Sequence, residues 1–245
     1  MIRAKLVREC MVFKKSRLCK KVGFTLVEVM VVVGIIGLLA LLLFPTFNKA
    51  RESALRAKCA SNLKQLGAAV FMYTADHDGN IYVPYPVSTV QFCGKQGSGA
   101  GINNPIRFLN PYLGGPFQAN TTDVLVARCP ADKGMPGGNN SQYNASGTSY
   151  MFNYVSPVVS KPTLSTLGQT NYKLINVAQH SKTLMILDQA AFNYYNGGDR
   201  KQHWHSKNDV RVNACFVDGH VEFILIPAPG SIPTYPNTDQ FTWDP

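Results

Sequence analysis

The chain has 245 residues, enough for one sizeable domain and an appendage, and its formal net charge is +10 at pH 7. Residues 1–23 hold eight Lys or Arg and one acid, a net charge of +7, so the other 222 residues carry only +3. This distribution argues against a basic patch on the folded body, and hence against a nucleic-acid partner. A strongly basic N-terminal segment is instead typical of targeting.

A long apolar run follows this segment. No charged residue occurs from Val29 to Asn48, which at ~1.5 Å per helical residue spans roughly 30 Å. We therefore expect a membrane helix, with residues 1–23 in the cytoplasm by the positive-inside rule. The competing interpretation is a cleaved secretory signal, but its apolar core would be shorter and would end at a small-residue cleavage site.

Glu28 lies at the start of this run, where a carboxylate is costly unless it has a partner. A cut between Gly23 and Phe24 would create a positively charged amino terminus at the edge of the membrane. In a stack of identical subunits, that amine is expected to pair with Glu28 of a neighbour and to set the register of the helices. Glu28 is therefore a candidate residue for subunit assembly.

The stretch KVGFTLVE, residues 21–28, resembles the processing site of type IV prepilins and type II secretion pseudopilins. The resemblance implies cleavage after Gly23 and N-methylation of Phe24 by a prepilin peptidase/N-methyltransferase. It also implies assembly with other copies or other pseudopilins on an inner-membrane platform. The protein would then be a single-pass protein of the bacterial inner membrane, with its head periplasmic or extracellular in a filament.

Two further features of the N-terminal region bear on this resemblance. Gly37 and Pro45 stand where pilin helices often carry Gly and Pro, and both residues favour local loosening of a helix. The 23-residue leader is long for the family, so translation starts either at Met1 or at Met11.

The helical pattern continues past the apolar run. Apolar residues recur every three or four positions and form an amphipathic stripe: Leu55, Cys59, Leu63, Leu66, Val70 and Tyr73. We expect one helix from Phe24 to about Ala75, ended by the turn signal at residues 78–79. Asp76, Asp78 and Asn80 resemble half of a calcium loop, but a helix C-terminal turn explains them without metal. We therefore expect no cofactor, with calcium as the less favoured alternative.

The C-terminal region predicts antiparallel strands. KTLMILDQA, residues 182–190, has the apolar run of a buried strand, and DVRVNACFVDGHVEFILI alternates on both sides of Asp218-Gly219. We expect a hairpin with a type I′ turn at these two residues. Three strands packed on the amphipathic helix make an α+β, pilin-like fold, with a long N-terminal helix on an antiparallel-sheet head.

The head also resembles a large-headed branch of the pseudopilin-like proteins. RCPAD and TSYMFNYV, at residues 128–132 and 148–155, are similar to segments of that branch and suggest a loop followed by a strand. The branch carries a His that is separated by nine intervening residues from the Asp-Gly of the hairpin. This chain has Asn208 at that place, which puts any role of that imidazole in doubt.

A metal site is the main alternative to a purely structural head. His203, His205, Asp188, Asp218 and His220 provide ligand types that zinc sites use. The expected interpretation is simpler: exposed loop histidines and a hairpin-turn Asp.

The cysteines of the head leave their pairing open. Cys59, Cys93, Cys129 and Cys215 allow three connectivities of two disulfides, and some of them are equally well explained as free buried thiols.

These features predict three segments: a cleaved basic leader (1–23), a transmembrane and amphipathic helix (24–76) and a globular head (77–245). No nucleophile elbow, HExxH, Walker loop or dinucleotide fingerprint occurs in the sequence, so no enzyme is expected. The favoured function is a structural subunit of a pseudopilus or type IV pilus-like filament. The alternative is a membrane-anchored binding or enzymatic head that uses a pilin-type export signal.

Overall fold

A computed structural model describes residues 25–81, 90–96, 107–115, 123–134, 141–153, 173–195, 204–206, 209–227 and 238–242. The chain forms two compact units, Met1–Phe47 and Asn48–Pro245, which we describe separately. The expected leader and the cleavage site at Gly23 and Phe24 lie outside the described residues. The three segments predicted from the sequence concern processing and membrane insertion, and they stay a prediction.

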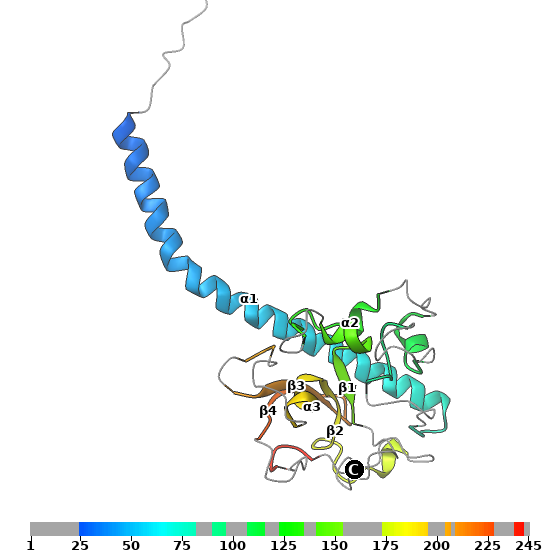
Figure 1. The fold of residues 1–245 in the computed structure, drawn as a ribbon. Helices are drawn as coiled ribbons and strands as arrows, with labels where there is room; N and C mark the ends of the chain where they lie inside the picture. Colours follow the sequence, from blue (N-terminus) through cyan, green and yellow to red (C-terminus); the bar gives the residue numbers. More distant parts are fainter. Residues whose placement is uncertain are drawn as a thin grey trace, which may run out of the picture. The chain divides into compact units, whose positions relative to one another are not determined.

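The first described element is the helix α1, Leu26–Asp76, which confirms the expected long helix (Figure 1). It continues through Pro45 without interruption. In the second unit, the predicted stripe is the buried side of α1: Cys59, Leu63, Leu66, Val70 and Tyr73 are buried, and Leu55 is half-buried against the core. The backbone then turns at Asp78 and Gly79, both with positive φ, as the Asp-Gly signal predicts.

The sheet of the head has four strands in the order β1-β2-β3-β4, and every neighbouring pair is antiparallel. Their bounds are β1 Tyr150–Phe152, β2 Leu184–Asp188, β3 Arg211–Phe216 and β4 Val221–Leu225. The expected strands correspond to β2, β3 and β4. The fourth strand, β1, lies within TSYMFNYV and pairs with β2 through Met151 and Leu187.

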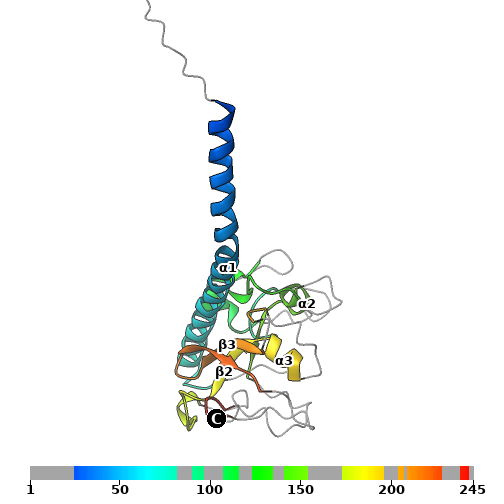
Figure 2. The same cartoon turned by 90° about the vertical axis from the view of Figure 1, so that its left-hand side faces the viewer.

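Short helices complete the described part of the head. They are the α-helices α2 (Gln142–Ser146) and α3 (Ala190–Tyr195), and the 3-10 helices at Asn110–Leu113, Leu125–Ala127 and Leu174–Asn176. In Figure 2, β2 and β3 lie between α1 on one side and α3 on the other. The centre of the sheet is therefore covered on both faces.

Because both faces of the sheet are covered, every residue of β3 after Arg211 is buried. Cys215 faces α1, whereas Val212 and Ala214 point to the opposite face. Asn213 points to the same face of β3 as Cys215, and it pairs with Phe223 of β4. The half-buried side chains of β4, to which Phe223 belongs, therefore also lie on the face that contacts α1. The two apolar alternations of the predicted hairpin thus lie on opposite faces of the sheet.

The hairpin turn differs from the expected type I′ geometry. Gly219 has φ +87°, but among the described non-glycine residues only Asp78 has positive φ, so Asp218 does not. The Gly219 amide donates to the Phe216 carbonyl at 2.9 Å, and the Phe216 amide donates to the His220 carbonyl at 2.9 Å. These bonds describe a four-residue turn followed by a glycine bulge, the arrangement of longer hairpin loops. The type I′ prediction was therefore wrong, although Asp218 and Gly219 do lie in the turn.

Candidate functional site

Glu28 has a partner in the residue that precedes its own helix. The Thr25 amide donates to Glu28 Oε2 at 2.8 Å, the Thr25 hydroxyl donates to the same oxygen at 2.7 Å, and the Glu28 amide donates to Thr25 Oγ1 at 3.3 Å. These reciprocal bonds form a capping box at the start of α1. The spacing Thr-x-x-Glu signals this motif, and our sequence analysis missed it. Glu28 therefore stabilises the helix start even without a second subunit.

The apolar part of α1 presents its side chains outward all around the helix. The large apolar residues from Leu26 to Phe47 are between 49% and 78% exposed. At Gly34 and Gly37, nothing beyond the adjacent residues and the surrounding helix backbone lies within 4 Å of the place where a Cβ would lie. By length and composition this helix is able to cross a membrane. A surface so uniformly apolar needs lipid or other helices around it.

The cysteines of the head divide into one pair and two free thiols. Cys59 of α1 and Cys129 form a disulfide with Cα atoms 5.2 Å apart, whereas Cys93 and Cys215 are free and buried. This outcome agrees with the alternative that some cysteines are free, and not with two disulfides. The disulfide ties α1 to the segment 123–134.

The head contains a buried acid–imidazole pair next to this disulfide. His205 Nε2 lies 3.5 Å from Asp188 Oδ2 at the end of β2, and both side chains are almost fully buried. Burial raises the pKa of the Asp188 carboxyl to about 7 and lowers the pKa of the His205 imidazole to about 4. In weakly acidic solution both groups are consequently neutral. The expectation that His205 is an exposed loop histidine was wrong.

Asp188 is held in place by β3, because the Asn213 amide donates to its Oδ2 at 2.8 Å. Its other oxygen, Oδ1, is buried and has no hydrogen-bond donor among the described residues. His205 Nδ1 and the donor Trp204 Nε1 are also buried and have no hydrogen-bond partner among the described residues. Several buried polar atoms without partners in one place are unusual in a folded protein.

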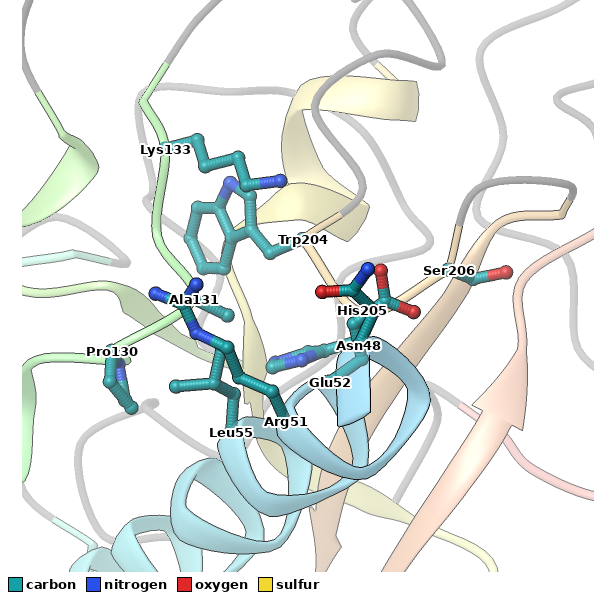
Figure 3. Close-up of a pocket in the computed structure, with 10 residues that line it drawn as sticks. All are labelled: Asn48, Arg51, Glu52, Leu55, Pro130, Ala131, Lys133, Trp204, His205 and Ser206. Atoms are coloured by element: carbon teal, nitrogen blue, oxygen red, sulfur yellow. The ribbon is translucent and has the colours of Figure 1, made fainter. Parts of the chain in front are cut away.

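His205 and Trp204 also line a pocket of about 390 Å³ (Figure 3). Figure 3 shows Arg51 and Leu55 of α1 on one side of it and Trp204 and Lys133 on the other. The lining carries both positive charge and one carboxylate, Glu52. The pocket is small and mixed in character, so its chemistry alone does not indicate a substrate.

The remaining candidate ligands do not gather into one site. Asp218 pairs with its neighbour His220, with Oδ1 and Nδ1 2.6 Å apart. Asp76 accepts a hydrogen bond from the Tyr112 hydroxyl at 2.9 Å. Among the described residues, the group of possible metal ligands is Cys59, Cys129 and His205, which does not include Asp76 or Asp78. His203 and Asn208 lie outside the described residues.

Two stretches of this chain match models of known protein families. Residues 21–44 match the prokaryotic N-terminal methylation motif, and residues 48–113 match a family described as a protein of unknown function (DUF1559). The type II secretion system core protein G of Pseudomonas aeruginosa is 33% identical over 135 residues, which are 55% of this chain and 80% of that relative. The chain belongs to the type II secretion system core protein G family.

Other relatives of this pseudopilin family match shorter stretches. The core protein G of Klebsiella pneumoniae is 46% identical over 55 residues, 22% of this chain and 39% of the relative. The competence protein ComGC of Halalkalibacterium halodurans is 43% identical over 56 residues, 23% of this chain and 55% of the relative. No solved structure matches the chain significantly. The family and the apolar N-terminal helix together indicate that this is a membrane-anchored, pseudopilin-like protein.

Proposed function

We propose that this pseudopilin-like protein is a structural subunit of a type II secretion-like filament. In this proposal a prepilin peptidase cuts after Gly23 and methylates Phe24, and the mature helix assembles with other copies or other pseudopilins on an inner-membrane platform. The leader lies in the cytoplasm and the head in the periplasm or outside the cell. The head does no catalysis.

The observation that carries this proposal is the apolar surface of α1. A membrane anchor needs about 20 apolar residues, and the run from Val29 onwards supplies them. The methylation-type motif precedes this run, and filament formation gives the exposed side chains a second apolar environment after they leave the lipid. An ordinary anchor would need the run but not the motif.

The capping box sharpens the argument about Glu28. A simple tether would also benefit from Glu28, because Thr25 and Glu28 stabilise the first turn of α1. The presence of an acidic residue at position 28 does not, by itself, support a role in filament assembly. What separates the two roles is charge: a capping box accepts Gln in place of Glu, whereas an ion pair with an amine does not.

Two matched variants test this. Glu28→Gln keeps the capping bonds and removes the charge, and Thr25→Val removes the hydroxyl and keeps the charge. We expect Glu28→Gln to insert into the membrane but to lose filament formation, whereas Thr25→Val still forms filaments. Filaments are measured by shearing and electron microscopy, and insertion by membrane fractionation. The opposite pattern, assembly lost in Thr25→Val and kept in Glu28→Gln, would overturn the proposal.

The pocket beside Trp204 is the observation that favours the second candidate, a membrane-anchored head that binds a ligand. This candidate predicts that head function survives when filament formation is lost. A Glu28→Gln chain that secretes or binds normally without filaments would favour it.

A further inference from the structure

The ring of His205 points at the disulfide of the head. His205 Nε2 lies 3.4 Å from Cys129 Sγ, and the ligand atoms of Cys59, Cys129 and His205 all lie within 4.8 Å of one another. They come from three separate segments, namely α1, residues 123–134 and residues 204–206. The fold thus brings two sulfurs and one imidazole nitrogen to one buried point.

This spacing fits a zinc ion once the disulfide is open. With Zn–S bonds of about 2.3 Å and Zn–N bonds of about 2.0 Å, the sulfur and nitrogen ligands of a tetrahedral site lie about 3.5 Å apart. The separation of His205 Nε2 from Cys129 Sγ already has that value. The two sulfurs must move apart to about 3.8 Å, which side-chain rotation allows.

An acidic and a basic side chain both act on this point, because the charge of Arg56 contributes to the lowered pKa of His205 and the carboxyl of Asp188 lies beside the imidazole. The Asp188 carboxyl group lies 3.5 Å from the same imidazole nitrogen, fully buried and with Oδ1 lacking a donor among the described residues. A buried carboxylate oxygen without a partner is costly, and a nearby divalent cation would offset that cost. A hydrogen-bond network alone leaves this oxygen unexplained.

We propose that the reduced head binds one Zn²⁺ through Cys59 Sγ, Cys129 Sγ and His205 Nε2, next to Asp188. A dithiol reductant opens the disulfide, becoming a disulfide itself, and leaves two thiols. Each thiol releases its proton to solvent when the ion takes the two thiolates. Every newly made chain begins in this dithiol state. Zinc then links the same three segments until a disulfide oxidant takes two electrons from the sulfurs and the ion leaves.

The test uses the full chain in detergent, reduced without oxygen, freed of reductant and then exposed to Zn²⁺ or Co²⁺. We expect one tightly held zinc per reduced chain and none per oxidised chain, measured by mass spectrometry of the metal after desalting. Co²⁺ should give a thiolate-to-metal charge-transfer band and the intense visible bands of a tetrahedral site. A reduced chain that retains no metal, or a cobalt spectrum without thiolate bands, would overturn the proposal.

Matched variants locate the ligands. Cys93→Ala/Cys215→Ala removes the other two thiols of the head and should keep the metal, whereas Cys59→Ser/Cys129→Ser should lose it. His205→Gln should weaken binding at least tenfold, and the exposed His220→Gln should not change it. If the double Ser variant does not fold, alkylation of the reduced wild-type chain decides: zinc must protect Cys59 and Cys129. Equal labelling with and without zinc would refute the site.

Discussion

Gly67 of α1 lies so close to Cys215 of β3 that a methyl group added at Gly67 would be 2.8 Å from the Cys215 sulfur. The same added carbon would be 3.5 Å from Met185 Cε of β2. Gly67 therefore lies where α1 is in close contact with β2 and β3. Its lack of a side chain lets the helix pack directly on the buried strands.

Gly67→Ala is expected to destabilise the head by about 1 kcal/mol. Overpacking costs about 1–3 kcal/mol, and Ala recovers up to about 1 kcal/mol of helix propensity over Gly. Removing the Cys215 sulfur should relieve the clash. The double variant Gly67→Ala/Cys215→Ala should therefore lose less unfolding free energy than the sum of the losses in the two single variants. Denaturant unfolding of the four chains measures this coupling. Strictly additive effects would show that the sulfur is not the obstacle.

Arg107 is a second buried structural residue. Its guanidinium donates to the carbonyls of Val90 at 2.7 Å, Cys93 at 3.1 Å and Ser146 at 2.8 Å, and only 1% of the residue is exposed. Arg107→Met keeps an unbranched apolar stem but removes the guanidinium, which leaves these carbonyls without their donor. We expect a loss of about 3 kcal/mol in unfolding free energy.

The matched control is Arg128→Met, because the Arg128 side chain lies over the Tyr143 ring at the surface. This change should cost less than about 1 kcal/mol. Similar losses in the two variants would contradict a special role of Arg107 in joining these loops.

The free thiols Cys93 and Cys215 should resist alkylation. Burial raises the pKa of each thiol to about 12, and only the thiolate reacts, so at pH 8 about one thiol in 10,000 is ionised. Because the pKa lies above the usual value, labelling of the native chain should increase as the pH rises towards 12. Peptide mapping after iodoacetamide treatment measures this. In guanidinium both residues should react rapidly, and rapid labelling of the native chain at pH 7 would contradict their burial.

Loss of the Cys59–Cys129 disulfide should lower the stability of the head substantially. The bond closes a loop with a sequence separation of 70 residues, for which chain entropy gives a stabilisation of about 4 kcal/mol. In the presence of a chelator, reduction should lower the melting temperature by about 10 °C. Calorimetry of the oxidised and reduced chains is the direct comparison. An unchanged melting temperature would show that the packing of α1 holds the head without this link.

Much of the fold could be predicted because it depends on local periodicity. The stripe from Cys59 to Tyr73 is the buried side of α1, and the run in KTLMILDQA is the buried strand β2. The strand β1 was harder to predict, because three residues that are all buried show no alternation. The hairpin turn type was wrong because an Asp-Gly pair also suits a longer loop in which only the glycine has positive φ.

The site was less predictable, because it depends on contacts between distant segments. His205 lies in a polar stretch, and nothing in its neighbours indicates that Cys129 and Asp188 bury it. The pairing of Cys59 with Cys129, too, follows from packing and not from spacing. The capping box is the exception, because the spacing of Thr25 and Glu28 is visible in the sequence. Our prediction considered only the charge of Glu28 and missed its hydrogen bonds with Thr25.

The central claim is that this chain is processed and assembled as a pseudopilin, and the intact mass of the protein purified from its native membrane tests it most directly. The account predicts a chain whose first residue is N-methylated Phe24. A mass that begins at Met1 or Met11, with the basic leader still attached, would contradict it.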